Sequence, residues 1–93
     1  MELKTIHDAE KNRFSIFIEN EEAYLAYRIQ PGGVLEFYST YVPDSGRGKG
    51  TARRLVDAGV EFAKSVNMKI KPSCSYVEKY FEKSPELSSL LAK

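Results

Sequence analysis

The stretch VPDSGRGKGTARRL, Val42 to Leu55, decides how the rest of the chain is organised. It gathers three glycines and four cationic side chains in one short run: Gly46, Gly48, Gly50, Arg47, Lys49, Arg53 and Arg54. Such a run can be a flexible basic arm that coats a polyanion, or a folded loop that cradles a single phosphate group. The segments on either side of the loop distinguish these two interpretations.

The composition is that of a small globular domain. The chain has 93 residues, of which 42% are hydrophobic and 29% charged, and this balance excludes a disordered polyelectrolyte. The formal net charge of +1 argues against a nucleic-acid adaptor, which usually carries a clear excess of cations. Cys74 is the one cysteine, and no apolar run reaches transmembrane length. We therefore expect one domain, residues 1–93, with Met1 to Asn12 loosely ordered and no membrane partner, in the cytoplasm or, in a eukaryote, the nucleus.

Three strands are predicted ahead of the loop. Apolar and polar residues nearly alternate over Arg13 to Asn20, and residues typical of strands fill Ala23 to Gln30 and Val34 to Val42. The polar turn Asn20 to Glu22 and the turn Pro31 to Gly33 join them. Three strands with such short connections form an antiparallel meander.

Helices and one further strand are predicted after the loop. Apolar residues recur at three- and four-residue steps from Ala52 to Val66, which indicates an amphipathic helix. Met68 to Pro72 reads as a short strand. Ser75 is followed three residues later by a glutamate, a capping-box pattern that predicts a helix to about Lys83. Ser84 and Pro85 begin a last short helix, so the fold class is α+β.

The glycines therefore lie where a helix begins, which favours the folded loop over the flexible arm. The first N–H groups of a helix have no partner inside it, and glycines allow several of them to converge on an anion. Arg47 and Lys49 can add full charges. The spacing fits neither of two common phosphate loops, because Lys49 is followed by Gly50 and Thr51 stands where a third fingerprint glycine belongs.

The pattern Arg-x-x-Gly-x-Ala, formed by Arg47, Gly50 and Ala52, resembles the acetyl-CoA loop of the GCN5-related N-acetyltransferase superfamily. FYSTYVP (Phe37 to Pro43) and KPSCSYVEKYFEKSPE (Lys71 to Glu86) together resemble a subfamily of very small members. That subfamily carries His-Thr-x-Val-Pro, Arg-Gly-x-Gly and a late Pro-x-Cys. The resemblance covers most of the chain from about Phe14.

This resemblance implies a minimal acetyltransferase-like fold: an antiparallel meander, a central helix, a splayed strand and C-terminal helices. It implies acetyl transfer from acetyl-CoA to an amine, with acyl-pantetheine lying where the two central strands part. Cys74 is then the proposed catalytic cysteine. The residues that would bind acetyl-CoA or coenzyme A are Tyr41, Val42, Gly46, Arg47, Gly48, Lys49, Gly50, Thr51 and Ala52. We assign no metal site.

One position departs from the subfamily pattern. Ser39 stands where the subfamily often has histidine, and serine cannot hold a proton at neutral pH as imidazole can. Ser39 and Thr40 should face opposite sides of their strand, and the resemblance favours Ser39 as the residue at the ligand. The chain is then either an acetyltransferase or a coenzyme A-binding module without transfer.

Four further expectations can be compared with a structure. Cys74 is either a small buried hydrophobe or a reactive thiol whose pKa is lowered by the following helix and by the nearby lysines, Lys69 and Lys71. His7 should be exposed and idle. Tyr76 lies either in the core, which we favour, or beside the cofactor. The resemblance implies two helices between the first two strands that shape the acceptor pocket. Here only Asn20 to Glu22 separates those strands, so the acceptor side should be open, as would suit a bulky or protein amine.

Overall fold

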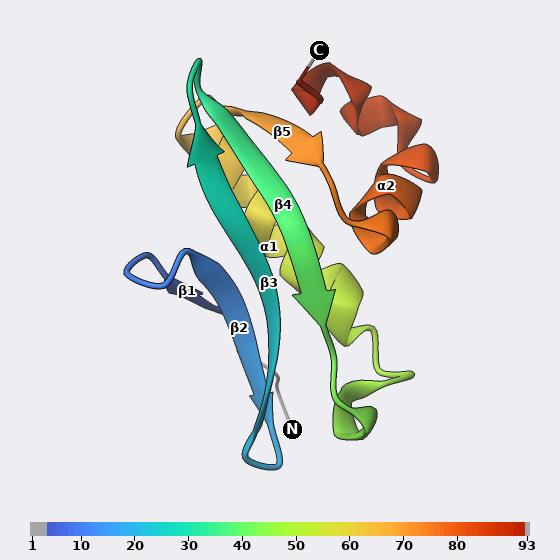
Figure 1. Ribbon diagram of the computed structural model, residues 1–93. Coiled ribbons are helices and arrows are strands. Elements are labelled where there is room, and N and C mark those ends of the chain that lie inside the picture. The colour runs from blue at the N-terminus through green and yellow to red at the C-terminus, as the bar shows by residue number, and fades with distance from the viewer. Residues whose placement is uncertain (1–3, 93) are drawn as a thin grey trace.

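The computed structural model describes residues 4–92, in which five strands form one sheet in the order β1-β2-β3-β4-β5 (Figure 1). The strands are β1 (Ile6–Asp8), β2 (Arg13–Ile18), β3 (Glu21–Gln30), β4 (Val34–Tyr41) and β5 (Lys69–Pro72). The helices are α1 (Thr51–Ser65) and α2 (Ser75–Glu82), with 3-10 helices η1 (Asp44–Gly46) and η2 (Pro85–Leu90). The first four strands are antiparallel and β5 is parallel to β4. The predicted α+β fold is confirmed.

The N-terminal strand β1 was not predicted. Met1 to Asn12 was expected to be loosely ordered; Met1 to Leu3 lie outside the described residues, but Ile6–Asp8 pairs with β2. The ring of His7 explains this, because it stacks on Phe14 at 4.4 Å between centroids and meets the edge of Phe62 at 4.4 Å. Its Nε2 also shares a 2.7 Å hydrogen bond with the Tyr27 hydroxyl. His7 is therefore packed, not idle, although much of it remains exposed.

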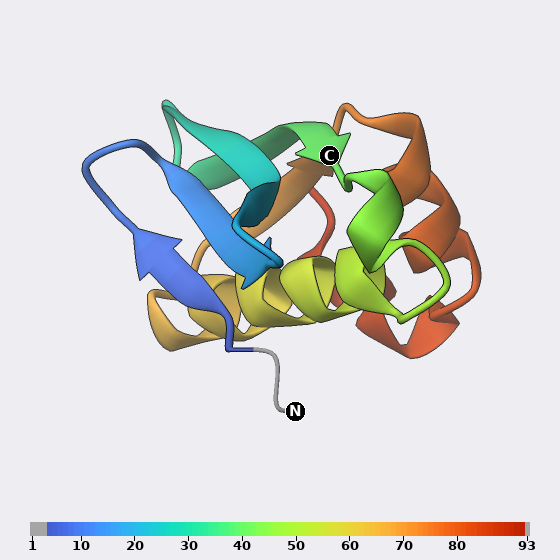
Figure 2. The ribbon, with the colours of Figure 1, turned by 90° about the horizontal axis from the view of Figure 1, so that it is seen from below.

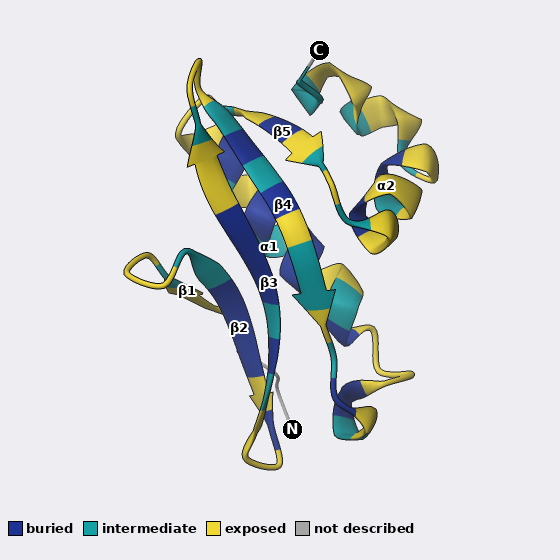
Figure 3. Ribbon diagram, viewed as in Figure 1, coloured by how far each residue is buried: buried dark blue, intermediate teal, exposed yellow. Residues whose placement is uncertain are grey.

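One face of the sheet packs on α1 and forms the core. Figure 2 shows α1 along this face, and Figure 3 shows that the buried segments of the strands and of α1 meet there. The fully buried side chains include Phe37 and Leu25 on the sheet and Leu55 on α1. Gly59 allows the close approach, since a methyl group there would lie 2.7 Å from Cζ of Phe37.

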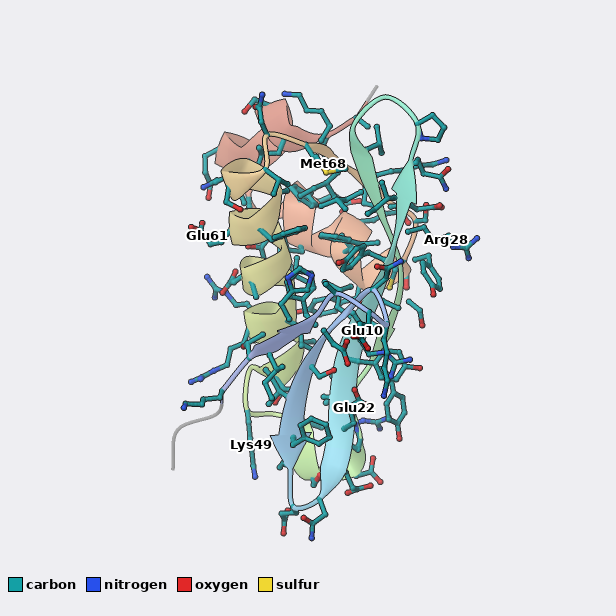
Figure 4. The ribbon with its side chains drawn as sticks, turned by 90° about the vertical axis from the view of Figure 1, so that its left-hand side faces the viewer. Glu10, Glu22, Arg28, Lys49, Glu61 and Met68 are labelled. Atoms are coloured by element: carbon teal, nitrogen blue, oxygen red, sulfur yellow. The ribbon has the colours of Figure 1, made fainter. Side chains whose placement is uncertain are left out.

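The opposite face of the sheet is not covered by any helix of residues 4–92 (Figure 2). Figure 4 shows the layers from the side: Glu61 lies on the outer side of α1, and Arg28 points away from α1 beyond the sheet. On this uncovered face the Arg28 guanidinium lies 4.0 Å from the centre of the Tyr38 ring. Within residues 4–92 this face is thus a bare sheet surface, and the open acceptor side expected from the sequence stays a prediction.

The strands β4 and β5 pair over only four residues each and then part, as the resemblance implied. Their pairing runs from Val34 with Lys69 to Phe37 with Pro72, and the Ser73 amide still donates to the Phe37 carbonyl at 3.0 Å. Beyond this point β4 continues to Tyr41, while the chain after β5 turns away toward α2 (Figure 1). Within residues 4–92, the end of β4 therefore has no paired strand on its β5 side.

The helix ends differ slightly from the prediction. Cys74 is the N-cap of α2 and its first residue is Ser75, with no side-chain cap hydrogen bond, so the predicted capping box is wrong. Ser84 and Pro85 do begin a helix, but it is of the 3-10 type. The Ala92 amide then donates to Ile70 at 2.8 Å, which holds the chain end against β5. No helix within residues 4–92 has the length and apolarity to cross a membrane.

Candidate cofactor and acyl site

The glycine loop and the start of α1 enclose a hollow of about 260 Å³, which we call the loop hollow. Seven of the nine residues predicted to bind the cofactor line it: Val42, Gly46, Arg47, Gly48, Gly50, Thr51 and Ala52. Arg53 and Tyr76, which the prediction did not include, complete the lining. The first turn of α1 thus opens into a concave surface, where its unpaired N–H groups can meet an anion.

The three loop glycines have different physical roles. Gly48 and Gly50 have φ angles of 77° and 71°, in the left-handed region that favours glycine, and a methyl group on either would meet no atom within 4 Å. Gly50 is also the N-cap of α1. Gly46 is instead buried, and a methyl group there would lie 2.6 Å from Cδ1 of Ile18. The buried Thr51 hydroxyl donates to the Gly46 carbonyl at 2.8 Å and fixes the loop on the helix.

Two predicted cofactor residues lie outside the loop hollow. Lys49 is exposed and projects from the loop into solvent (Figure 4). Tyr41 pairs with Tyr24 across β3 and β4, with ring centroids 5.7 Å apart, on the uncovered face of the sheet. Arg47 does line the hollow, although its guanidinium forms an exposed ion pair of 3.1 Å with Asp44. Exposed pairs of this kind contribute little, so Arg47 can exchange it for a ligand phosphate.

Tyr76 lies at the site and not in the core. Tyr76 is 37% exposed and lines the loop hollow, whereas Val77 and Phe81 on the other side of α2 are buried. Our preference for the core was therefore wrong for Tyr76. Its place on the first turn of α2, opposite the loop, makes α2 the second wall of the hollow.

The only cysteine, Cys74, lies where β4 and β5 part, half-buried against β4. Its Sγ is 3.4 Å from Oγ1 of Thr40. Burial is the largest influence on the Cys74 pKa and raises it, but the Thr40 hydroxyl bond lowers it. The amides of Val77, Tyr76 and Thr40 lower it further, so the net pKa is below the ordinary value. The amides of Tyr76 and Val77 belong to the first turn of α2, where the helix dipole also favours a negative charge.

Thr40, and not Ser39, is the β4 residue beside the thiol. Thr40 pairs with the buried Leu25, so it shares the face that carries α1. Ser39 pairs with Ala26 and points to the uncovered face. The alternation that forbids both residues from facing one ligand was visible in the sequence. The choice between them depended on a strand bulge, which leaves Tyr38 without a partner and shifts the register by one residue.

The lysines expected to lower the Cys74 pKa are engaged elsewhere. Lys69 Nζ donates to the Ser89 carbonyl at 2.7 Å. Lys71 flanks Glu36, whose pKa is lowered by hydrogen bonds from Ser73 and Gln30 and, to a smaller extent, by this lysine. Both lysines alternate with the buried Ile70 and therefore point away from the core face. The lowered pKa of the Cys74 thiol thus depends on Thr40 and on backbone amides, not on these lysines.

Comparison with known proteins identifies the family. The family model of the GCN5-related N-acetyltransferases matches residues 13–90. The chain belongs to this family. It is 28% identical to the protein NATD1 of Mus musculus and 27% identical to that of Homo sapiens, each over 85 residues. Both matches cover 89% of this chain; they cover 77% of the mouse protein and 75% of the human protein.

A solved structure agrees with this family. The solution structure of a GCN5-like protein from Staphylococcus aureus matches with a TM-score of 0.71 and 29% identity, over 98% of this chain and 87% of that one. The chain is thus an acetyltransferase-like protein by sequence and by fold, and use of acetyl-CoA is implied by the family. The predicted resemblance is confirmed.

Proposed function

We propose that this protein binds acetyl-CoA, with the pyrophosphate in the loop hollow and the thioester beside Cys74, and transfers the acetyl group to an amine. One observation carries the proposal: the loop hollow and the thiol adjoin on both sides of the opening, at the end of β4 and at the start of α2. Val42 and Tyr76 line the hollow. Val42 lies two residues after Thr40, and Tyr76 lies two residues after Cys74. An extended ligand can therefore hold its phosphates in the loop and reach the thiol.

The loop side of this binding mode is supported by charge and by shape. The hollow offers the free N–H groups at the start of α1, a partial positive charge from the helix dipole, and the guanidiniums of Arg47 and Arg53. Because Gly48 and Gly50 carry no side chain, a phosphate can approach the backbone of the loop directly.

Two chemical routes are open for the transfer. Bound acetyl-CoA supplies an activated acyl thioester. In the direct route, the site orients the acceptor amine against that thioester and polarises its carbonyl. In the covalent route, Cys74 as thiolate forms a bond to the acetyl carbon while the coenzyme A thiolate leaves, and the amine then takes the acetyl group from Cys74. The lowered pKa of Cys74 favours the thiolate that this route requires.

The acceptor would arrive over the uncovered face of the sheet. Only Glu19 and Asn20 separate β2 from β3, so no inserted helices enclose this side. A flat, open surface suits an amine carried on a large molecule such as a protein better than a small free amine, which needs a pocket to hold it.

A coenzyme A-binding module without transfer is the second candidate, and one observation favours it. His7 is the only histidine of the chain, and it lies on β1, the opposite edge of the sheet from β5. No imidazole is therefore at hand to take the proton that the amine loses. A nucleic-acid adaptor is disfavoured by the net charge of +1.

Calorimetric titration and an acyl-transfer assay test the proposal. The protein is titrated with acetyl-CoA and with a random oligonucleotide, and thioester consumption is followed with and without amine acceptors, including a lysine-containing protein. Binding of acetyl-CoA with amine-dependent consumption supports transfer. Binding of acetyl-CoA without thioester consumption supports the coenzyme A-binding module. Binding of the oligonucleotide but not of acetyl-CoA would overturn both candidate functions.

A further inference from the structure

A second hollow of about 310 Å³ continues from the loop hollow along α2; we call it the α2 groove. Six residues line it: Arg53, Tyr76, Lys79, Tyr80, Lys83 and Ser84. Arg53 and Tyr76 line both hollows, so the two form one continuous surface. A ligand seated in the loop can therefore extend into the α2 groove without leaving the protein.

The α2 groove is lined by cationic side chains that form no ion pair with a neighbouring carboxylate within residues 4–92. Arg53, Lys79 and Lys83 contribute three positive charges. Within residues 4–92 the ion pairs join Arg13 to Glu22, Arg47 to Asp44 and Lys64 to Glu61, so none of them neutralises a groove cation. Two carboxylates act on Tyr80: Asp57 accepts a 2.6 Å hydrogen bond from its hydroxyl, and Glu86 has a smaller electrostatic effect.

We propose that the α2 groove binds the 3′-phosphate of coenzyme A, through Lys79 and Lys83, and thereby selects coenzyme A over its 3′-dephospho form. This rests on the proposed function, in which the pyrophosphate occupies the loop hollow. Coenzyme A carries one further phosphate, a monoester on the ribose, with close to two negative charges at neutral pH. The cations beside the loop hollow match that remaining group.

The side-chain charges, and not backbone amides, must attract this phosphate. Lys79 lies in the last turn of α2 and Lys83 is its C-cap, where the helix dipole presents its negative end. The α2 groove therefore differs from the loop hollow, in which amides do much of the binding. Removing the lysine charges should abolish the contribution of the 3′-phosphate and leave pyrophosphate binding unchanged.

The test compares two ligands on three proteins by calorimetry. The ligands are coenzyme A and 3′-dephospho-coenzyme A. The proteins are wild type, the double variant Lys79→Gln with Lys83→Gln, and a control that removes the same charge elsewhere, Lys11→Gln with Lys64→Gln. Binding of the dephospho ligand shows in each case that the protein is folded and that its loop is intact.

We expect wild type and the control to bind coenzyme A about tenfold more tightly than the dephospho ligand, as two exposed charge contacts would give. The α2 variant should bind both ligands equally, and added salt should reduce the preference of wild type. Equal binding of both ligands by wild type, or a preference that survives in the α2 variant, overturns the 3′-phosphate site in the α2 groove. The proposed pyrophosphate site in the loop hollow is not affected by that result. If wild type binds neither ligand, both the pyrophosphate site in the loop hollow and the 3′-phosphate site in the α2 groove are overturned.

Discussion

Thr40 Oγ1 lies 3.4 Å from the sulfur of Cys74, across the opening between β4 and the start of α2. The two residues are 34 positions apart in the chain. A hydroxyl in this place can accept a hydrogen bond from the thiol and donate one to the thiolate. This pair therefore couples the splayed strands to the reactivity of the cysteine, and it provides the first prediction.

Thr40→Val should raise the pKa of Cys74, because it removes the hydroxyl that stabilises the thiolate while keeping the side-chain shape. The rate of Cys74 alkylation is measured against pH, and at neutral pH it should be severalfold slower than in wild type. Ser39→Ala is the matched control, since Ser39 faces the other side of the sheet. An alkylation profile that moves with Ser39→Ala and not with Thr40→Val would contradict the pairing.

Ala52→Asp should weaken acetyl-CoA binding by about tenfold or more, because it sets a carboxylate in the loop hollow against the pyrophosphate. The fold should be preserved, since an acidic residue suits the first turn of a helix. Ala52→Asn matches the size without the charge and should have a much smaller effect. Valine at Gly50 would be a poorer test, because φ there is 71° and the strain would disturb the helix start itself.

If the two Ala52 variants weaken binding equally, bulk and not charge is responsible, and the assignment of the hollow to a phosphate fails. Calorimetry gives the affinities, and urea unfolding confirms that both variants are folded.

Gly59→Ala should destabilise the protein by about 1–3 kcal/mol, in spite of the better helix propensity of alanine. The added methyl group would lie 2.7 and 2.9 Å from ring atoms of Phe37, which is fully buried. Urea unfolding measures the change. In the double variant with Phe37→Leu the two losses should not add, because the smaller side chain relieves the contact; simple additivity would show that this contact is not the cause.

Ser39→His should increase acetyl transfer if position 39 borders the acceptor path on the uncovered face. A positioned general base contributes about a hundred- to ten-thousandfold, so even an imperfect one should be visible. Thioester consumption is measured with and without amine in wild type, Ser39→His, and Ser39→His with Cys74→Ala. The gain should vanish in the double variant under the covalent route and persist under direct transfer. Unchanged turnover in Ser39→His would remove position 39 from the chemistry.

His7 should make the fold sensitive to mild acid. Burial lowers the pKa of His7 below its ordinary value and outweighs the opposing effect of Asp8. The unfolded chain therefore binds the proton more readily, and the stability due to neutral His7 is lost as the pH falls below about 6.5. His7→Gln should show a smaller loss of stability between pH 7 and 5 in urea unfolding. Equal losses in both proteins would mean that protonation of His7 does not loosen β1.

The sequence alone determined the order of elements from β2 onward and the place of the phosphate loop. These features are local: apolar residues at two- or three-to-four-residue steps define β2 to β4 and α1, and the glycines lie directly before Thr51, where α1 begins. The chemistry of a helix start needs no distant contact. For that reason seven of the nine predicted cofactor residues meet at one hollow.

Only the tertiary structure decided what surrounds the cysteine and what holds the N-terminus. A bulge in β4 turns Thr40 toward Cys74 and Ser39 away, and strand pairing over a long separation sets that register. Strand β1 has only three residues and is held by the contacts of His7 with Phe62 and Tyr27, which lie far away in the sequence. Contacts of this kind leave no local periodicity, so pattern alone could not reveal them.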